Sequence, residues 1–164
     1  VKFILKNYDL LPEYIVQLRP TTPFRSVIDI NKALEYLKRN NTSTSLRSSH
    51  IADHPPEKQF RIWDNYYCNV NLKRDKRDLF NKPSQLFKLT YEPNGYVDIL
   101  KTNFLVKNIG KKIIYGQKIL PFITSKKIDI DTIEDFIYAE NIKDKNKGII
   151  KKYYKKIWKF FLSV

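Results

Sequence analysis

Two aspartates separated by one residue, Asp129 and Asp131, are the residues whose type and spacing most directly suggest chemistry. The β-branched pattern of residues 128–131 predicts the end of a strand, where side chains two apart point to the same face. Two adjacent carboxylates repel each other unless water or a cation lies between them, and Mg²⁺ prefers such oxygen ligands together with substrate phosphates. The pattern therefore predicts a magnesium site for phosphoryl transfer. The alternative is that Asp131 or Thr132 caps the following helix and that Asp129 is an exposed strand-end residue.

A second candidate is the loop Arg-Pro-Thr-Thr-Pro-Phe-Arg at residues 19–25. Its two guanidinium groups, Arg19 and Arg25, could hold a phosphate or a carboxylate bidentately. A stiff connection from a strand to a helix, with solvated arginines, is the equal alternative.

The third candidate is Asn94-Gly95, which leads into the apolar run 95–100. Asn-Gly can form a tight turn. If it instead opens the strand directly, the amide of Asn94 could lie at the same sheet edge as the loop 19–25.

Positioning these residues requires a layered α/β domain, because short β-branched runs alternate with helical spacing. A capping box at Ser26 begins the longest predicted helix, 27–39. The irregular stretch 50–89 is expected to be an excursion from the main sheet. The predicted strands are 14–18, 44–48, 66–71, 95–100, 113–115 and 122–124, and the other predicted helices are 102–106 and one from Thr132 to about 141.

Composition limits the class of protein. The 164 residues carry a formal charge of +14, a 42% hydrophobic content and one cysteine. These values fit one domain with a core, predict no disulfide framework and favour the cytoplasm. We expect no secretory leader, and the sequence has no membrane-length apolar run. It also lacks methionine, and we expect it to be the rear part of a longer protein.

Half of the charge lies in a Lys-rich tail, because residues 143–164 hold eight lysines and one aspartate, and 14 − 7 leaves +7 for residues 1–142. Apolar residues recur there at helical spacing, which predicts a basic amphipathic helix. Docking on the domain and peripheral contact with an anionic membrane remain open, with nucleic-acid binding the less favoured reading.

Five segments, in this order and spacing, resemble the acylneuraminate cytidylyltransferases, also called CMP-sialic acid synthetases. The similarity covers about residues 14–140, the C-terminal two-thirds of such an enzyme. The segments are LRPTTPFR (18–25), TSLRS (44–48), PEKQF (56–60), PNGYVDI (93–99) and DIDTIEDF (129–136).

The resemblance implies a Rossmann-like nucleotide-diphospho-sugar transferase fold, incomplete at its N-terminus. It implies transfer of CMP from CTP to a nine-carbon acidic sugar, a nonulosonate such as sialic acid, with release of pyrophosphate. Residues 1–142 would be the partial catalytic domain, and 50–89 the excursion through which a homodimer forms. Asp129 and Asp131 would be catalytic and hold Mg²⁺, and the residues implied to bind substrate are Arg19, Thr21, Thr22, Lys58, Asn94, Gly95 and Asp98.

The chain departs from the family pattern at several places. Arg19 replaces a common glutamine, and Asp98 stands at a usual tyrosine, which favours another nonulosonate or a different acidic sugar. The Arg-Gln-x-Leu-Pro run appears only as Lys82-Pro83-Ser84-Gln85-Leu86-Phe87. No Gly-Ser-Lys phosphate loop is present, so we expect little activity from this chain alone. The alternative function is a non-enzymatic basic module that binds a membrane surface or nucleic acid through residues 143–164.

Overall fold

A four-stranded sheet forms the centre of the chain in the computed structural model, which describes residues 11–70 and 81–145. The strands are β1 (Tyr14–Gln17), β2 (Ser45–Ile51), β5 (Tyr91–Lys101) and β6 (Ile119–Ile123), in the order β1-β5-β2-β6. β5 runs antiparallel to both of its neighbours, whereas β2 and β6 are parallel. The chain is thus a mixed α/β protein with a mixed sheet, an arrangement compatible with a Rossmann-like fold.

The sheet places the loops that follow β1 and β6 at one edge. Because β1 and β2 are both antiparallel to β5, and β6 is parallel to β2, all three strands point the same way. Their carboxyl ends therefore share an edge, and the first half of β5 lies at that edge too. Ligands of open α/β sheets bind beyond such strand ends.

Helix α2 (Val27–Lys38) covers one face of the sheet and confirms the helix predicted for 27–39. Ala33 and Leu37, one helical turn apart, are fully buried against the sheet. Their partners in the core are Leu46 on β2 and Tyr96, Val97 and Ile99 on β5. Replacing a buried leucine such as Leu37 by alanine typically costs about 2–5 kcal/mol of stability.

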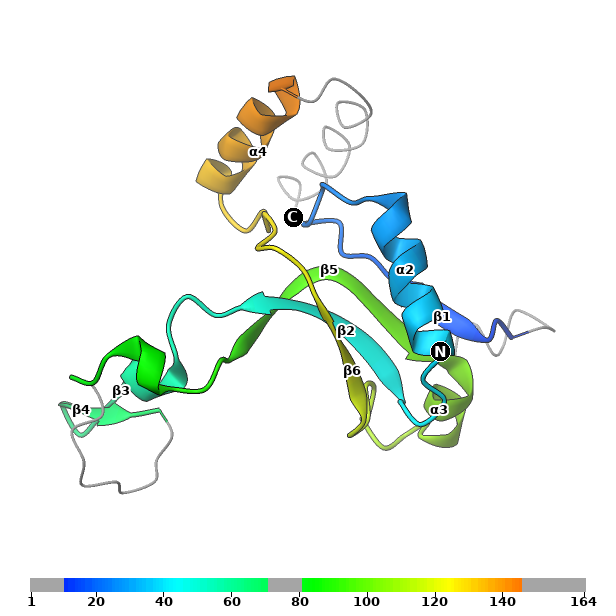
Figure 1. Cartoon of the computed structure of the whole chain (residues 1–164), viewed down its shortest axis with the longest axis horizontal. Coiled ribbons are helices and arrows are strands. Elements are labelled where there is room, and N and C mark those ends of the chain that lie inside the picture. Colours follow the sequence, from blue (N-terminus) through cyan, green and yellow to red (C-terminus); the bar gives the residue numbers. More distant parts are fainter. Residues whose placement is uncertain (1–10, 71–80, 146–164) are drawn as a thin grey trace.

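The excursion predicted for 50–89 contains a separate two-stranded sheet. β3 (Phe60–Trp63) pairs antiparallel with β4 (Tyr66–Asn69), and the tight turn uses positive φ angles at Asp64 and Asn65. Short 3₁₀ turns at Pro56–Lys58 and Ser84–Leu86 flank it. The hairpin lies at the end of the molecule opposite α2 (Figure 1). Strand 66–71 is confirmed as far as Asn69, and residues 71–80 lie outside the described part.

Two predicted strands are wrong. Residues 113–115 form bends rather than a strand, because positive φ angles at Lys112 and Gly116 bracket them and break the extended run. Residues 128–131 form an irregular segment whose Ile130 N–H donates to the Thr21 carbonyl (2.9 Å) instead of joining a strand ladder. The argument that places Asp129 and Asp131 on one strand face therefore does not hold.

The remaining helices begin where the sequence predicts. α3 (Thr102–Lys107) follows β5 directly, and α4 (Ile133–Lys145) begins after Thr132. The basic helix predicted for 143–164 lies outside the described residues from position 146 on. No helix in the described part of the chain is long and apolar enough to cross a membrane.

Candidate functional site

The loop 19–25 packs directly against Gly95 of β5. Gly95 has φ +65°, and a Cβ added there would meet Arg19 Cδ at 3.0 Å and Thr22 Oγ1 at 3.1 Å. Asn94-Gly95 therefore lies within a strand that begins at Tyr91, and the tight-turn interpretation is wrong. The pairing of β5 with β2 shifts register here, between Arg47 and Ser49, so the glycine sits at an irregularity of the ladder.

Arg25 holds this contact in place. Its Nε donates to the Tyr96 carbonyl (2.7 Å), and one terminal nitrogen donates to the Gly95 carbonyl (3.1 Å). The guanidinium also donates to the carbonyls of Arg19 and Thr22. Arg25 is therefore a structural clamp between loop and strand, which corrects the interpretation of it as an anion-binding residue.

The segment that carries Asp129 joins the same place. Thr22 is 1% exposed, and its hydroxyl donates a hydrogen bond to Asp129 Oδ1 at 3.5 Å. Together with the Ile130–Thr21 backbone bond, this contact joins residues more than 100 positions apart in the chain. The structure thus brings Arg19, Thr21, Thr22, Gly95 and Asp129 together.

Asp131 lies at the start of α4 but does not cap it. Thr132 Oγ1 accepts from the Asp135 N–H (3.2 Å), and Asp135 Oδ2 accepts from the Thr132 N–H (3.0 Å) and hydroxyl (2.8 Å). These reciprocal bonds form a capping box, so Thr132 is the cap, as one alternative predicted. They also hold the pKa of the Asp135 carboxyl below its usual range.

The two candidate metal ligands differ in exposure. Asp129 is half-buried and Asp131 is exposed. Neither carboxylate has a cationic partner within ion-pair distance among residues 11–70 and 81–145, and no group of three or more His, Cys, Asp or Glu there could hold a metal. Mg²⁺ is bound in many proteins through one or two carboxylates, with water and phosphate oxygens at its other positions.

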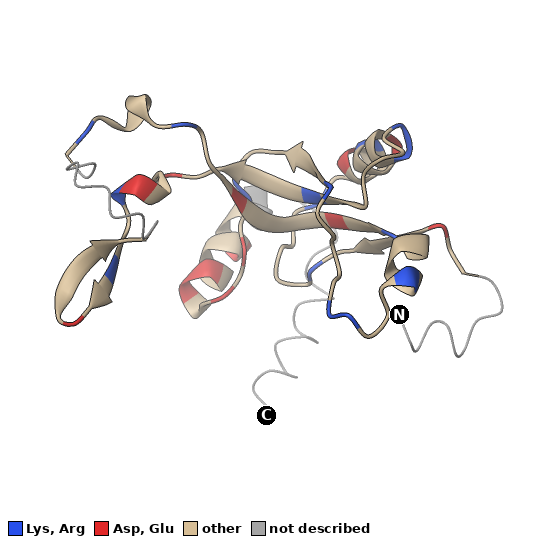
Figure 2. Ribbon diagram, turned by 90° about the horizontal axis from the view of Figure 1, so that it is seen from below, with Lys and Arg blue, Asp and Glu red and all other residues tan. Residues whose placement is uncertain are grey.

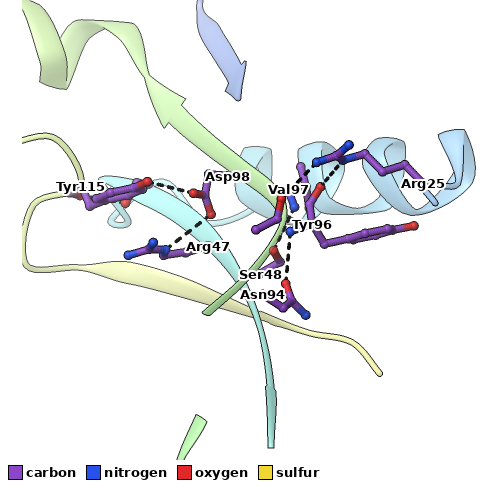
Figure 3. Close-up of polar contacts among 10 residues, drawn as sticks. Arg25, Arg47, Ser48, Asn94, Tyr96, Val97, Asp98 and Tyr115 are labelled. Carbon is purple, nitrogen blue, oxygen red and sulfur yellow. Dashed lines mark hydrogen bonds and ion pairs between the residues drawn. The ribbon is translucent and has the colours of Figure 1, made fainter. Parts of the chain in front are cut away.

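A second polar cluster lies further along β5. The Asp98 side chain is 2% exposed, and its Oδ2 accepts from the Tyr115 hydroxyl (2.8 Å). Arg47 Nε lies 3.6 Å from Oδ1, which is an ion pair without a direct hydrogen bond. The Arg47 guanidinium lies over the Tyr115 ring, 4.7 Å from its centre, so the three side chains form one closed group (Figure 3).

Tyr96 joins β5 to the start of α2. Its hydroxyl accepts from the Ser26 N–H (2.8 Å) and donates to Asp29 Oδ2 (2.8 Å). Ser26 Oγ accepts from the Asp29 N–H at 3.4 Å, which confirms Ser26 as the N-cap. In a capping box the acid would accept from the Ser26 N–H, but here the Tyr96 hydroxyl does so. Burial raises the pKa of Tyr96, and the bond to Asp29 raises it further, so the phenol stays protonated.

Asn94 is buried, and both polar atoms of its side-chain amide are hydrogen-bonded. Its Nδ2 donates to Thr124 Oγ1 (2.7 Å), and its Oδ1 accepts from the Tyr96 N–H (3.3 Å). These bonds connect β5 to the segment that leads toward Asp129. Lys58, in contrast, ends the 3₁₀ turn Pro56–Lys58 shortly before β3. Figure 1 shows the hairpin β3–β4 away from the four-stranded sheet.

Sequence reasoning missed the polar contacts of Arg47, Tyr115 and Tyr96. Arg47 carried a signal, because it is the one charged residue in the otherwise uncharged run 44–49. The sequence around Tyr115 gave no such signal. Its position depends on two hydrogen bonds, which Thr44 Oγ1 (2.6 Å) and Ser45 Oγ (2.7 Å) donate to the Tyr115 carbonyl.

No protein-family profile matches the sequence, and no curated protein matches it either.

Proposed function

We propose that the chain is the sugar-binding and metal-binding part of a Mg²⁺-dependent cytidylyltransferase that transfers CMP from CTP to a nine-carbon acidic sugar and releases pyrophosphate. The sequence resemblance suggests the reaction. The observation that supports it most is the meeting of Thr22 with Asp129 and of Arg19 with Gly95 at one strand-end edge. This edge is where nucleotide-binding α/β folds place their ligands.

The proposed nucleotide side of the site consists of Asp129 and Asp131. They would hold Mg²⁺, which would supply charge neutralisation at the phosphates of CTP. Thr22 orients Asp129 through its hydroxyl, and the Ile130–Thr21 bond fixes the approach of that segment to the loop. Both contacts are buried or half-buried, so they restrict where the carboxylate can point.

The proposed sugar side consists of Arg19, Thr21, Asn94 and Gly95. Gly95 lets the Arg19 side chain approach the strand closely, because a Cβ there would lie 3.0 Å from Arg19 Cδ and the φ of +65° is strained for other residues. The bond from Asn94 to Thr124 ties this side to the segment that carries Asp129. Direct contact of Thr22 and Asp98 with substrate stays a prediction, since both side chains are buried.

We further propose a homodimer in which the hairpin β3–β4 and Lys58 reach the partner's substrate. The hairpin exposes a group of large apolar side chains that has no cover within the described residues; its most exposed members are Ile62, Trp63, Tyr66 and Tyr67. Other described lysines and arginines are spread over several elements with acids between them (Figure 2). Anionic substrates suit such a chain, and we propose no nucleic-acid partner.

CMP transfer is the direct test of this function. Radiolabelled CTP and N-acetylneuraminic acid are incubated with residues 1–164, alone and joined to a segment that carries a Gly-Ser-Lys loop. We expect weak turnover without the loop, and Asp129→Asn should lower turnover of the joined protein by about 100-fold or more. Unchanged turnover in that variant would show that the proposed mechanism is wrong. Glu140→Gln, at an exposed position of α4, is the matched control.

A further inference from the structure

The Arg47 guanidinium is fixed on one side and free on the other. Arg47 Nε lies 3.6 Å from Asp98 Oδ1, and the guanidinium carbon lies 4.7 Å from the centre of the Tyr115 ring. Its terminal nitrogens have no acceptor among the described residues, and the side chain is 29% exposed. An arginine held in this way has already lost its conformational freedom and presents a preformed fork.

The group that holds Arg47 is itself rigid. Asp98 is buried and bonded to Tyr115, while two hydroxyls, from Thr44 and Ser45, fix the Tyr115 carbonyl. Burial and the Asp98 bond raise the pKa of Tyr115, so it remains a donor at neutral pH. Asp98 is 2% exposed, with Oδ2 bonded to Tyr115 and Oδ1 facing Arg47 as an ion pair, so it is poorly placed to accept a bond from a ligand.

A second guanidinium lies nearby. Arg19 rests on Gly95, three residues before Asp98 on β5, which corresponds to about 10 Å along a strand. Arg19 and Arg47 thus lie along the same stretch of β5, and Asp98 offsets the charge of Arg47 alone.

We infer that Arg47, positioned by Asp98 and Tyr115, binds the carboxylate of an acidic sugar together with Arg19, and that Asp98 is a positioning residue rather than a ligand contact. The choice of a sugar carboxylate rests on the proposed function. A phosphate would satisfy the same fork, so the test must separate the two anions.

The test measures the affinity of residues 1–164 for N-acetylneuraminic acid, for its methyl ester and for inorganic phosphate, by calorimetry without Mg²⁺ or CTP. We expect the acid to bind, the ester to bind at least about tenfold more weakly, and Arg47→Gln to weaken binding of the acid by about 10- to 100-fold. Arg47→Lys should restore little of it, because lysine lacks the fork. Arg39→Gln, exposed at the end of α2, removes the same charge and should have no effect.

Asp98→Asn distinguishes positioning from simple repulsion by the sign of its effect. If Asp98 only repelled an anion, its neutralisation would tighten binding; if it positions Arg47, binding of the acid should weaken by about tenfold. Thermal unfolding of each variant identifies any that has lost its fold. If Asp98→Asn has done so, the binding measurement is made on Tyr115→Phe, a milder change that keeps the ring beside Arg47.

Three results would overturn the inference: no binding of any anion, equal effects of Arg47→Gln and Arg39→Gln, or tighter binding by Asp98→Asn. Preferential binding of phosphate that depends on Arg47 would overturn the assignment to a carboxylate. The assay contains neither metal nor nucleotide, so its outcome does not depend on the transfer of CMP. Failure of the proposed transferase function and failure of this inference are thereby distinguishable.

Discussion

Gly95 shows how a single residue sets the geometry of the proposed site. The sequence Asn-Gly permits a turn or a strand, and only the tertiary contacts decide between them. Arg19 and Thr22 occupy the space a Cβ would need, while the Asn94 side chain bonds across to Thr124. Local propensity cannot predict such an arrangement, because the partners are about 30 and 70 residues away in the sequence.

Gly95→Ala should destabilise the fold and displace Arg19. The positive φ costs about 1–2 kcal/mol in an L-residue, and the new methyl group must also push against Arg19 and Thr22. Gly110→Ala is the matched control, because Gly110 has φ +90° and open space around it. We expect urea unfolding to show a larger loss for Gly95→Ala than for Gly110→Ala. Equal losses would contradict the close approach of Arg19.

Tyr115→Phe removes the donor to a buried carboxylate. The unpaired Asp98 oxygen should cost about 1–3 kcal/mol in the free energy of unfolding. Tyr36→Phe, at an exposed position of α2, should change it little. Chemical denaturation of the two variants provides the comparison, and a Tyr115→Phe protein as stable as wild type would argue against the cluster.

At the scale of elements, the hydrophobic pattern predicted those that carry their own signals. Ser26 and the apolar residues at helical spacing located α2, and the apolar run 14–18 located β1. The strand expected at 44–48, as the end of a strand-helix-strand unit, corresponds to β2. The pattern failed at 113–115, where Ile113 and Ile114 imitate a strand yet are about half-exposed (46% and 53%). It failed again at 128–131, where one backbone bond to Thr21 replaces a ladder.

The start of α4 should depend on pH through Asp135. Bonds from the Thr132 hydroxyl, and then from backbone N–H groups, hold the pKa of Asp135 below its ordinary 3.8. A lowered folded pKa stabilises the folded state above the unfolded value, and this stabilisation is lost as the pH falls through the folded value. We therefore expect the Thr132 amide to lose protection from hydrogen exchange below about pH 4.

Asp135→Asn should remove this dependence, whereas Glu134→Gln, at a neighbouring exposed acid without a capping bond, should keep it. If the exchange of the Thr132 amide follows the same pH profile in wild type and in Asp135→Asn, the capping box does not contribute as described.

At the scale of the whole molecule, the separation of the hairpin from the sheet is the main feature. The sequence indicated an excursion at 50–89 from its irregular pattern, and the structure gives it a sheet of its own. The convergence of the loop 19–25, Gly95 and Asp129 at one edge could be anticipated only in outline, from the rule about strand ends. The cluster of Arg47, Asp98 and Tyr115 required the structure.

Ile62→Lys should dissociate the proposed homodimer. A charge among the apolar side chains of the hairpin would have to be buried at the interface, at a cost of several kcal/mol. Val27→Lys, at an equally exposed apolar position of α2 (72% for both), is the control. Sedimentation velocity should show a monomer only for the hairpin variant. A wild-type chain that is already monomeric would contradict the dimer.

The account rests most directly on a carboxylate site that binds CTP through Mg²⁺. Calorimetric titration with CTP, in Mg²⁺ and then in EDTA, tests it on residues 1–164 joined to a segment that carries a Gly-Ser-Lys loop, as wild type, as Asp129→Asn and as the control Glu140→Gln. We predict that CTP binds in Mg²⁺, that EDTA and Asp129→Asn each weaken binding by about tenfold or more, and that Glu140→Gln, at an exposed position of α4, has no effect. CTP binding that is absent, or that is the same with and without Mg²⁺ and with and without Asp129, would contradict the account.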